Sequence, residues 1–152
     1  KGPHGFEGTY GGYPPFAAIN AKNVVDETGK TGAMLIDLEK VTVWDPDIIF
    51  LNPTNMDLIN EDYKKNKSFY DGLTAIKEGR VYSQISYNYN STNIELAIAN
   101  AYYAGKIIFP EQFKDVDPKA KADEIFMAML GQAYYDRLVE AGIGFGPLTI
   151  GK

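Results

Sequence analysis

A chain of 152 residues is long enough to bury a core and suits a single domain over 1–152. Apolar residues make up 45% and charged residues 23%, a balance that excludes a disordered chain. The net charge of -5, with lysines spread among acids, excludes the basic stripe of a nucleic-acid-binding protein, and the absence of cysteine excludes disulfides, thiolate metal sites and cysteine nucleophiles.

The sequence carries no targeting or membrane-spanning signal. No apolar run is as long as a membrane span requires, and residues 1–10 lack the charged and apolar regions of a signal peptide. The chain also begins without Met. We therefore expect it to be a segment of a longer protein.

The first part of the chain alternates between helical and extended patterns. Apolar residues at helical spacing predict a helix over 16–29, and the apolar run 33–36 predicts a buried strand. Asp37 is placed to cap a short helix over 38–44, which must end before a proline. The run 47–51 predicts a strand that is covered on both faces, as in a parallel sheet.

The middle of the chain is polar and predicts a loop followed by helical turns. The loop is expected over 52–60 and the helical turns over 61–67 and 69–78. Ser68 and Asp71 have the spacing of a capping box, which predicts that the second of these turns starts at Ser68.

A strand over 80–85 is followed by the longest predicted helix, over 93–109. Thr92 and Glu95 have capping-box spacing at its start. The residues predicted to share its apolar face are Ile94, Ala97, Ile98, Ala101, Gly105 and Ile108.

The last part of the chain predicts two helices and an irregular tail. Asp117 and Gly131 are expected to delimit the first helix, and the second is expected over 132–141. Buried strands that alternate with helices indicate an α/β fold with a mostly parallel sheet. Ligands bind such sheets at the carboxyl ends of the strands, which marks the loops 52–55 and 86–92 as candidate sites.

Familiar catalytic motifs are rejected on their spacing. The stretch 29–33 resembles a phosphate loop, but Val24 stands where the first glycine of that motif is needed. The glycines of 142–146 lack the strand and helix of a dinucleotide loop. His4 is the single histidine and lies near the terminus, which excludes a His-rich metal site and argues against a Ser-His-Asp triad.

Tyrosine is the distinctive residue, with 11 in the chain. Most of them lie on predicted helices, where aromatic rings commonly pack. Tyr87 and Tyr89 instead alternate with amides in the loop after the third strand, where a rigid ring beside an adaptable amide suits ligand contact. Structural packing of the turn is the alternative for these two residues.

Three stretches together resemble a known family. The residues 13–32, 44–52 ("WDPDIIFLN") and 73–126 are similar to the C-terminal lobe of periplasmic iron-complex binding proteins of ABC transporters, of the siderophore, haem or cobalamin type. The likeness covers nearly the whole chain and keeps the order of the elements.

The resemblance implies a three-layer, Rossmann-like α/β lobe with helices on both sides of the sheet, one of two lobes joined by a long helix. It implies that a metal chelate such as an iron-siderophore is held between the lobes and delivered to a membrane permease. An extracytoplasmic location, periplasmic or at the cell surface through the parent's lipoprotein anchor, is implied too. No catalysis and no cofactor are expected.

The resemblance also suggests site residues. The expected ligand contacts are Tyr87, Tyr89, Asn90, Tyr10, Tyr13 and His4. A tyrosine can ligate ferric iron through its phenolate or stack on an organic chelator. Glu7 is the expected contact with the permease, with a solvated loop charge as its alternative. Arg80 and Arg137 lie outside these segments, so either the other lobe supplies cations for an anionic chelate or the ligand is nearly neutral.

Two other classes of function stay open from the residues alone. A carbohydrate-binding module is one, because Tyr and Asn also suit sugars. The other is an α/β hydrolase or transferase that uses a carboxylate, but no loop pairs a carboxylate with a positioned nucleophile.

Overall fold

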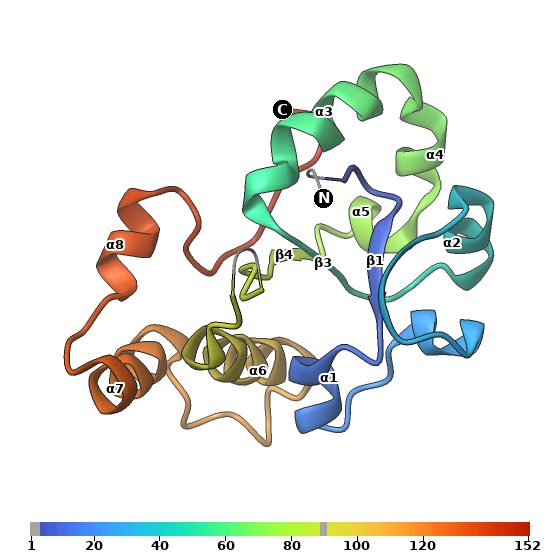
Figure 1. Cartoon of the computed structure of the whole chain (residues 1–152). Coiled ribbons are helices and arrows are strands. Elements are labelled where there is room, and N and C mark those ends of the chain that lie inside the picture. The colour runs from blue at the N-terminus through green and yellow to red at the C-terminus, as the bar shows by residue number, and fades with distance from the viewer. Residues whose placement is uncertain (1–3, 89–90) are drawn as a thin grey trace. The chain divides into compact units, whose positions relative to one another are not determined.

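The chain divides into two compact units (Figure 1). The computed structural model describes residues 4–88 and 91–152. Unit 1 comprises Lys1–Tyr13, Asn23–Ser83 and Gly146–Lys152, and unit 2 comprises Pro14–Lys22 and Gln84–Phe145. A single domain over 1–152 stays a prediction.

Unit 1 contains two small sheets. Strand β1 (Gly8–Gly11) pairs antiparallel with β2 (Gly32–Leu35), and β3 (Ile49–Leu51) pairs in parallel with β4 (Val81–Ser83). The predicted α/β class is confirmed, with this one parallel pair among the described residues. The expectation that 33–36 is buried is wrong, because no residue of β2 is buried and Leu35 is 60% exposed.

Unit 1 also contains short helical segments. They are η1 (Val24–Thr28), α2 (Leu38–Trp44), η2 (Pro53–Asn55), α3 (Met56–Lys65), α4 (Lys67–Gly72) and α5 (Thr74–Lys77). The predicted cap of α2 is confirmed, since the Asp37 carboxylate accepts a hydrogen bond from the Glu39 amide at 2.9 Å. The core consists of Phe6, Val41, Ile49, Ile59, Tyr70, Leu73, Ala75 and Val81.

Unit 2 is helical in the part that the structure describes. Its helices are α1 (Pro14–Ala18), α6 (Ile94–Ile108), α7 (Pro118–Leu130) and α8 (Tyr135–Glu140). Helix α6 packs against α1 and α7 (Figure 1). The predicted ends of α7 are confirmed, because Asp117 accepts from the Ala120 amide at 2.8 Å and Gly131 adopts a left-handed φ of 75°. The core consists of Ile85, Ala99, Ala122, Phe126, Tyr135 and Leu138.

The predicted helix over 16–29 is wrong. Helix α1 ends at Ala18, and η1 starts at Val24. Between them Asn20 adopts a positive φ of 55°, which an α-helix does not allow. The Asn23 side chain then accepts a hydrogen bond from the Val25 amide at 3.3 Å and starts a separate turn.

The capping box at Ser68 is wrong as well. Helix α4 starts at Lys67, and no side chain caps it. The Asp71 carboxylate instead accepts a hydrogen bond from the Tyr63 hydroxyl at 3.1 Å and pairs with the Lys67 ammonium. Asp71 therefore bonds to a side chain of the preceding helix instead of to the backbone amide that a capping box requires.

The start and the buried face of α6 also differ from the sequence-based expectation. Asn93, rather than Thr92, occupies the N-cap position, and its side chain makes no capping hydrogen bond. Ile94 and Ile98 are 55% and 38% exposed. The residues of α6 that are buried are Ala99, Asn100, Ala101, Tyr103, Ala104 and Gly105. Glu95 therefore lies in the first turn without closing a capping box.

Candidate functional site

The parallel pair places the ends of β3 and β4 at one edge, with Leu51 opposite Ser83. After β3 the Asn52 side chain accepts from the Thr54 amide at 3.2 Å, and Pro53 begins η2. Helix α3 follows directly at Met56, so the predicted loop over 52–60 is wrong beyond its first residues. The proline is compatible with the first turn of a helix, which permits this early start.

The segment that leaves β4 is tied to α6 by a buried amide in unit 2. The side chain of Asn100, which is fully buried, donates to the Ile85 carbonyl at 2.7 Å and accepts from the Ile85 amide at 3.2 Å. Gln84 donates to the Asn100 carbonyl at 3.4 Å, and its own Oε1 is buried without a hydrogen-bond partner among the described residues. The Asn100 side chain thus satisfies both backbone hydrogen-bonding groups of Ile85, as a neighbouring strand would.

The loop expected to contact ligand starts from this anchored segment. Tyr87 is 6% exposed, and its carbonyl accepts from the Asn93 amide at 2.7 Å. Tyr89 and Asn90 lie outside the described residues. A ligand contact at these three residues stays a prediction.

A pair of tyrosines lies at the end of β1 in unit 1. The rings of Tyr10 and Tyr13 meet edge to face, with centroids 5.6 Å apart, and both residues are partly exposed. His4 is exposed, and Glu7 is partly exposed while its carbonyl accepts from the Ile36 amide at 3.0 Å. Tyr10 and Tyr13 therefore offer an aromatic surface that a ligand can reach.

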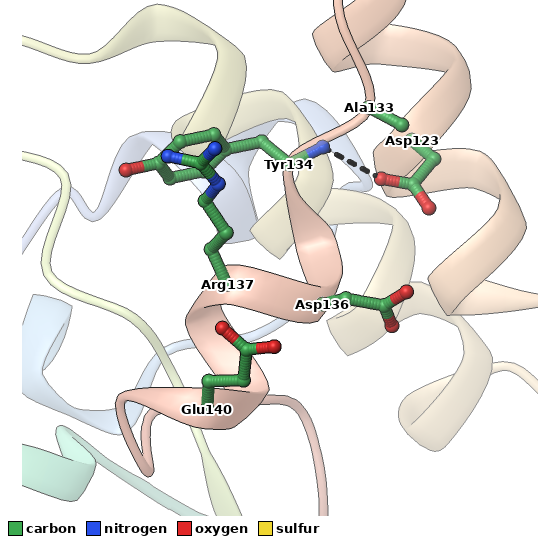
Figure 2. Close-up of a pocket in the computed structure, with 6 residues that line it drawn as sticks. All are labelled: Asp123, Ala133, Tyr134, Asp136, Arg137 and Glu140. Carbon is green, nitrogen blue, oxygen red and sulfur yellow. Dashed lines mark hydrogen bonds between the residues drawn. The ribbon is translucent and has the colours of Figure 1, made fainter.

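A polar hollow in unit 2, of about 570 Å³, was not found from the sequence. It is lined by Asp123, Ala133, Tyr134, Asp136, Arg137 and Glu140 (Figure 2). Asp123 accepts from the Tyr134 amide at 3.0 Å, and the Arg137 guanidinium lies over the Tyr134 ring, 5.6 Å from its centroid. The acidic residues of the polar hollow come from two helices, so no single stretch of the sequence predicts it.

An apolar groove of about 410 Å³ is also present in unit 2. It is lined by Pro14, Pro15, Ala18, Ile19, Ala97, Ile98, Ala101, Tyr102 and Phe113. Three of the residues expected on the buried face of α6 line this groove, which explains why that face is only partly covered.

The described residues contain no group of three His, Asp or Glu side chains that could hold a metal ion. No helix in residues 4–88 and 91–152 is long and apolar enough to cross a membrane.

Neither the family models nor the curated proteins contain a match to this chain. Solved structures do match. One is a periplasmic solute-binding protein from Veillonella parvula, 18% identical with a TM-score of 0.64 over 90% of this chain and 45% of that one. The TroA-like periplasmic binding protein FepB from Veillonella parvula is 20% identical, with a TM-score of 0.61 over 93% and 44%.

A third match is the molybdate periplasmic binding protein MolA of a Haemophilus influenzae ABC transporter, bound to molybdate. It is 22% identical, with a TM-score of 0.65 over 84% of this chain and 40% of that one. The chain thus has the α/β fold of a periplasmic binding-protein lobe. It spans less than half the length of these structures.

Proposed function

We propose that this chain is a ligand-binding lobe of an extracytoplasmic solute-binding protein that serves an ABC importer and has no catalytic activity. The fold likeness extends over 84% to 93% of the chain, and the matched proteins are binding proteins. A second lobe of the same protein would close over the ligand, and a membrane permease would receive it. A lipoprotein anchor in the parent protein is part of this proposal.

The proposed ligand is a metal chelate of the iron-siderophore, haem or cobalamin type. The observation that carries this proposal is the partly exposed pair of Tyr10 and Tyr13, whose rings lie 5.6 Å apart. Aromatic rings stack on an organic chelator, and a phenolate is a good ligand for ferric iron. Tyr87, Tyr89 and Asn90 are proposed as further contacts.

A bare oxyanion is a weaker candidate for the ligand. Bidentate recognition of an oxyanion favours arginine. The Arg80 guanidinium already pairs with Glu78 at 2.8 Å, and Arg137 lies over the Tyr134 ring. Molybdate, which MolA binds, is therefore included as a competitor in the test.

The permease contact is proposed at Glu7. This residue is partly exposed and lies directly before β1. An acidic side chain at the surface can pair with arginines of a partner, although such a rim contact acts mainly on association rate and specificity.

The test measures quenching of protein fluorescence in the full-length protein that carries this chain. The probes are ferric hydroxamate and catecholate siderophores, haem, cobalamin, molybdate and a panel of sugars. We expect saturable quenching by a chelate, weakened about tenfold or more by Tyr10→Ala or Tyr13→Ala, because most of a ligand's surface is buried in its site. The Tyr63→Phe variant, on α3, is the control.

Phenylalanine variants separate the two roles of the phenols. Tyr10→Phe or Tyr13→Phe abolishes affinity if the hydroxyl ligates iron and preserves it if the ring only stacks. Binding of a sugar alone would support a carbohydrate-binding protein. A lack of binding to every probe, with the protein folded, would contradict the proposed function.

A further inference from the structure

Two hydrogen bonds tie the backbone around Tyr10 to a turn farther along the chain. The Asn23 side chain donates from Nδ2 to the Tyr10 carbonyl at 2.9 Å. The Gly12 amide donates to Oδ1 of Asp26 at 2.6 Å. The two backbone groups lie on either side of Gly11, so residues 10–12 are held at both ends. All these residues belong to unit 1.

Asn23 and Asp26 act together rather than separately. Nδ2 of Asn23 also approaches Oδ1 of Asp26 at 3.2 Å, and Oδ1 of Asn23 accepts from the Val25 amide at 3.3 Å. The amide is thereby oriented by its own turn, with its donor side toward the Tyr10 carbonyl. A carboxylate that accepts from a backbone amide makes a stronger hydrogen bond than a neutral acceptor.

The backbone between the tyrosines leaves little room for other conformations. Gly12 has a φ of 61°, which disfavours other residues. A Cβ at Gly11 would lie 2.1 Å from the Lys30 carbonyl oxygen. Tyr10 also lies in register opposite Ala33 of β2. The strand pairing and the hydrogen bonds of Asn23 and Asp26 together fix the backbone that carries the two tyrosine side chains.

We propose that Asn23 and Asp26 are positioning residues, which hold Tyr10 and Tyr13 in the orientation that meets the ligand. This inference rests on the proposed function. Asp26 is exposed, so its part in the fold is this hydrogen bonding and not core packing. It acts on the ligand through the backbone of Gly12 and not by contact.

The experiment compares Asp26→Ala with Asp26→Asn and with Asp57→Ala. Asp57 is an exposed acid in the first turn of α3, so its removal changes the charge equally without affecting Gly12. Three quantities are measured in the full-length protein: the Kd for a ferric trihydroxamate chelate, the nuclear Overhauser contact between the rings of Tyr10 and Tyr13, and the Tm.

We expect Asp26→Ala to weaken binding about tenfold and to reduce the ring-to-ring contact, because one charge-assisted hydrogen bond is lost. Asp26→Asn retains an oxygen acceptor for the Gly12 amide and should bind within about threefold of the wild type. Asp57→Ala should leave both quantities unchanged. Rescue by asparagine separates positioning from a general effect of charge.

A second variant covers the case in which Asp26→Ala fails to fold. Asn23→Asp keeps the acceptor for the Val25 amide but removes the donor to the Tyr10 carbonyl, so it should also weaken binding and the ring contact. Unchanged affinity in the folded Asp26 and Asn23 variants would overturn the inference, whether or not the ring contact changes. A wild type that binds no chelate would overturn the proposed function itself, and the positioning role with it.

Discussion

Tyr70 is the most enclosed aromatic residue of unit 1. Its side chain is fully buried, its hydroxyl donates to Asp62 at 2.6 Å, and its ring lies edge to face with that of Phe6, with 5.2 Å between centroids. Burial is the main cause that raises the pKa of Tyr70 well above its usual value of 10.0, and the hydrogen bond to Asp62 raises it further. Burial also raises the pKa of Tyr135 in unit 2.

These shifts predict a loss of stability in alkali. Below about pH 10 both tyrosines are protonated in the folded and the unfolded chain. Above it the unfolded chain loses these protons first, so it binds fewer protons than the folded chain and the free energy of unfolding falls. Urea unfolding between pH 8 and pH 11 should show this fall.

The Tyr70→Phe variant tests the assignment of that fall. It should be less stable by roughly 1 kcal/mol at neutral pH, because the hydrogen bond to Asp62 is lost, and should show a shallower alkaline fall. Tyr63→Phe, at a more exposed hydroxyl, is the control. An alkaline slope that Tyr70→Phe leaves unchanged would assign the fall to other groups.

At the scale of elements, α6 and the segment after it make an unusually close approach. An added Cβ at Gly105 would lie 2.4 Å from the Phe113 ring, whereas an added Cβ at Gly72, in α4, would meet nothing within 4 Å. The two glycines lie in helices but in opposite surroundings. The ring of Phe113 therefore requires a residue without a side chain at Gly105.

The two glycines give a matched pair of alanine variants. Alanine favours a helix over glycine by up to about 1 kcal/mol, so Gly72→Ala should be neutral or slightly stabilising. Gly105→Ala should destabilise by about 1–3 kcal/mol despite the same preference, because Phe113 must move. Urea unfolding measures both, and equal effects at the two positions would contradict the close approach.

For the whole molecule, the relation of the two units in folding is the main question. The chain passes between them after residues 13, 22, 83 and 145. Each unit has its own apolar core. Because these crossings connect the two cores through several segments of one chain, we expect both cores to unfold in one cooperative transition, in keeping with a single domain.

Two core variants test this coupling. Ile59→Ala in unit 1 and Phe126→Ala in unit 2 should each destabilise by about 3 kcal/mol. The fluorescence of Trp44, in unit 1, and hydrogen exchange of α7, in unit 2, should shift together in both variants. Val43→Ala, at a residue 83% exposed, is the control. A Trp44 transition that is unaffected by Phe126→Ala would show two independent domains.

Prediction from the sequence succeeded where the signal is local. The cap at Asp37 and the stop at Gly131 are single-residue features of the backbone, and the structure confirms both. The capping boxes at Ser68 and Thr92 are wrong, because their spacing is common and no side chain caps α4 or α6. Asp71 binds Tyr63 and Lys67, which the spacing rule does not consider.

The candidate site shows the same division. The family resemblance predicts Tyr10 and Tyr13 as ligand contacts, but their edge-to-face contact needs the register of β1 and β2. The roles of Asn23 and Asp26 were not foreseen, because their partners lie 13 and 14 residues away. The six residues of the polar hollow likewise come from separate segments.

The sequence by itself determined the α/β class and the helix that Asp117 caps and Gly131 ends. These follow from apolar periodicity and from caps, which act over a few residues. Only the tertiary structure decided that Asn100 holds the segment after β4 and that Tyr87 is buried. Contacts between residues distant in the chain have no local pattern, and they form only when the whole fold is in place.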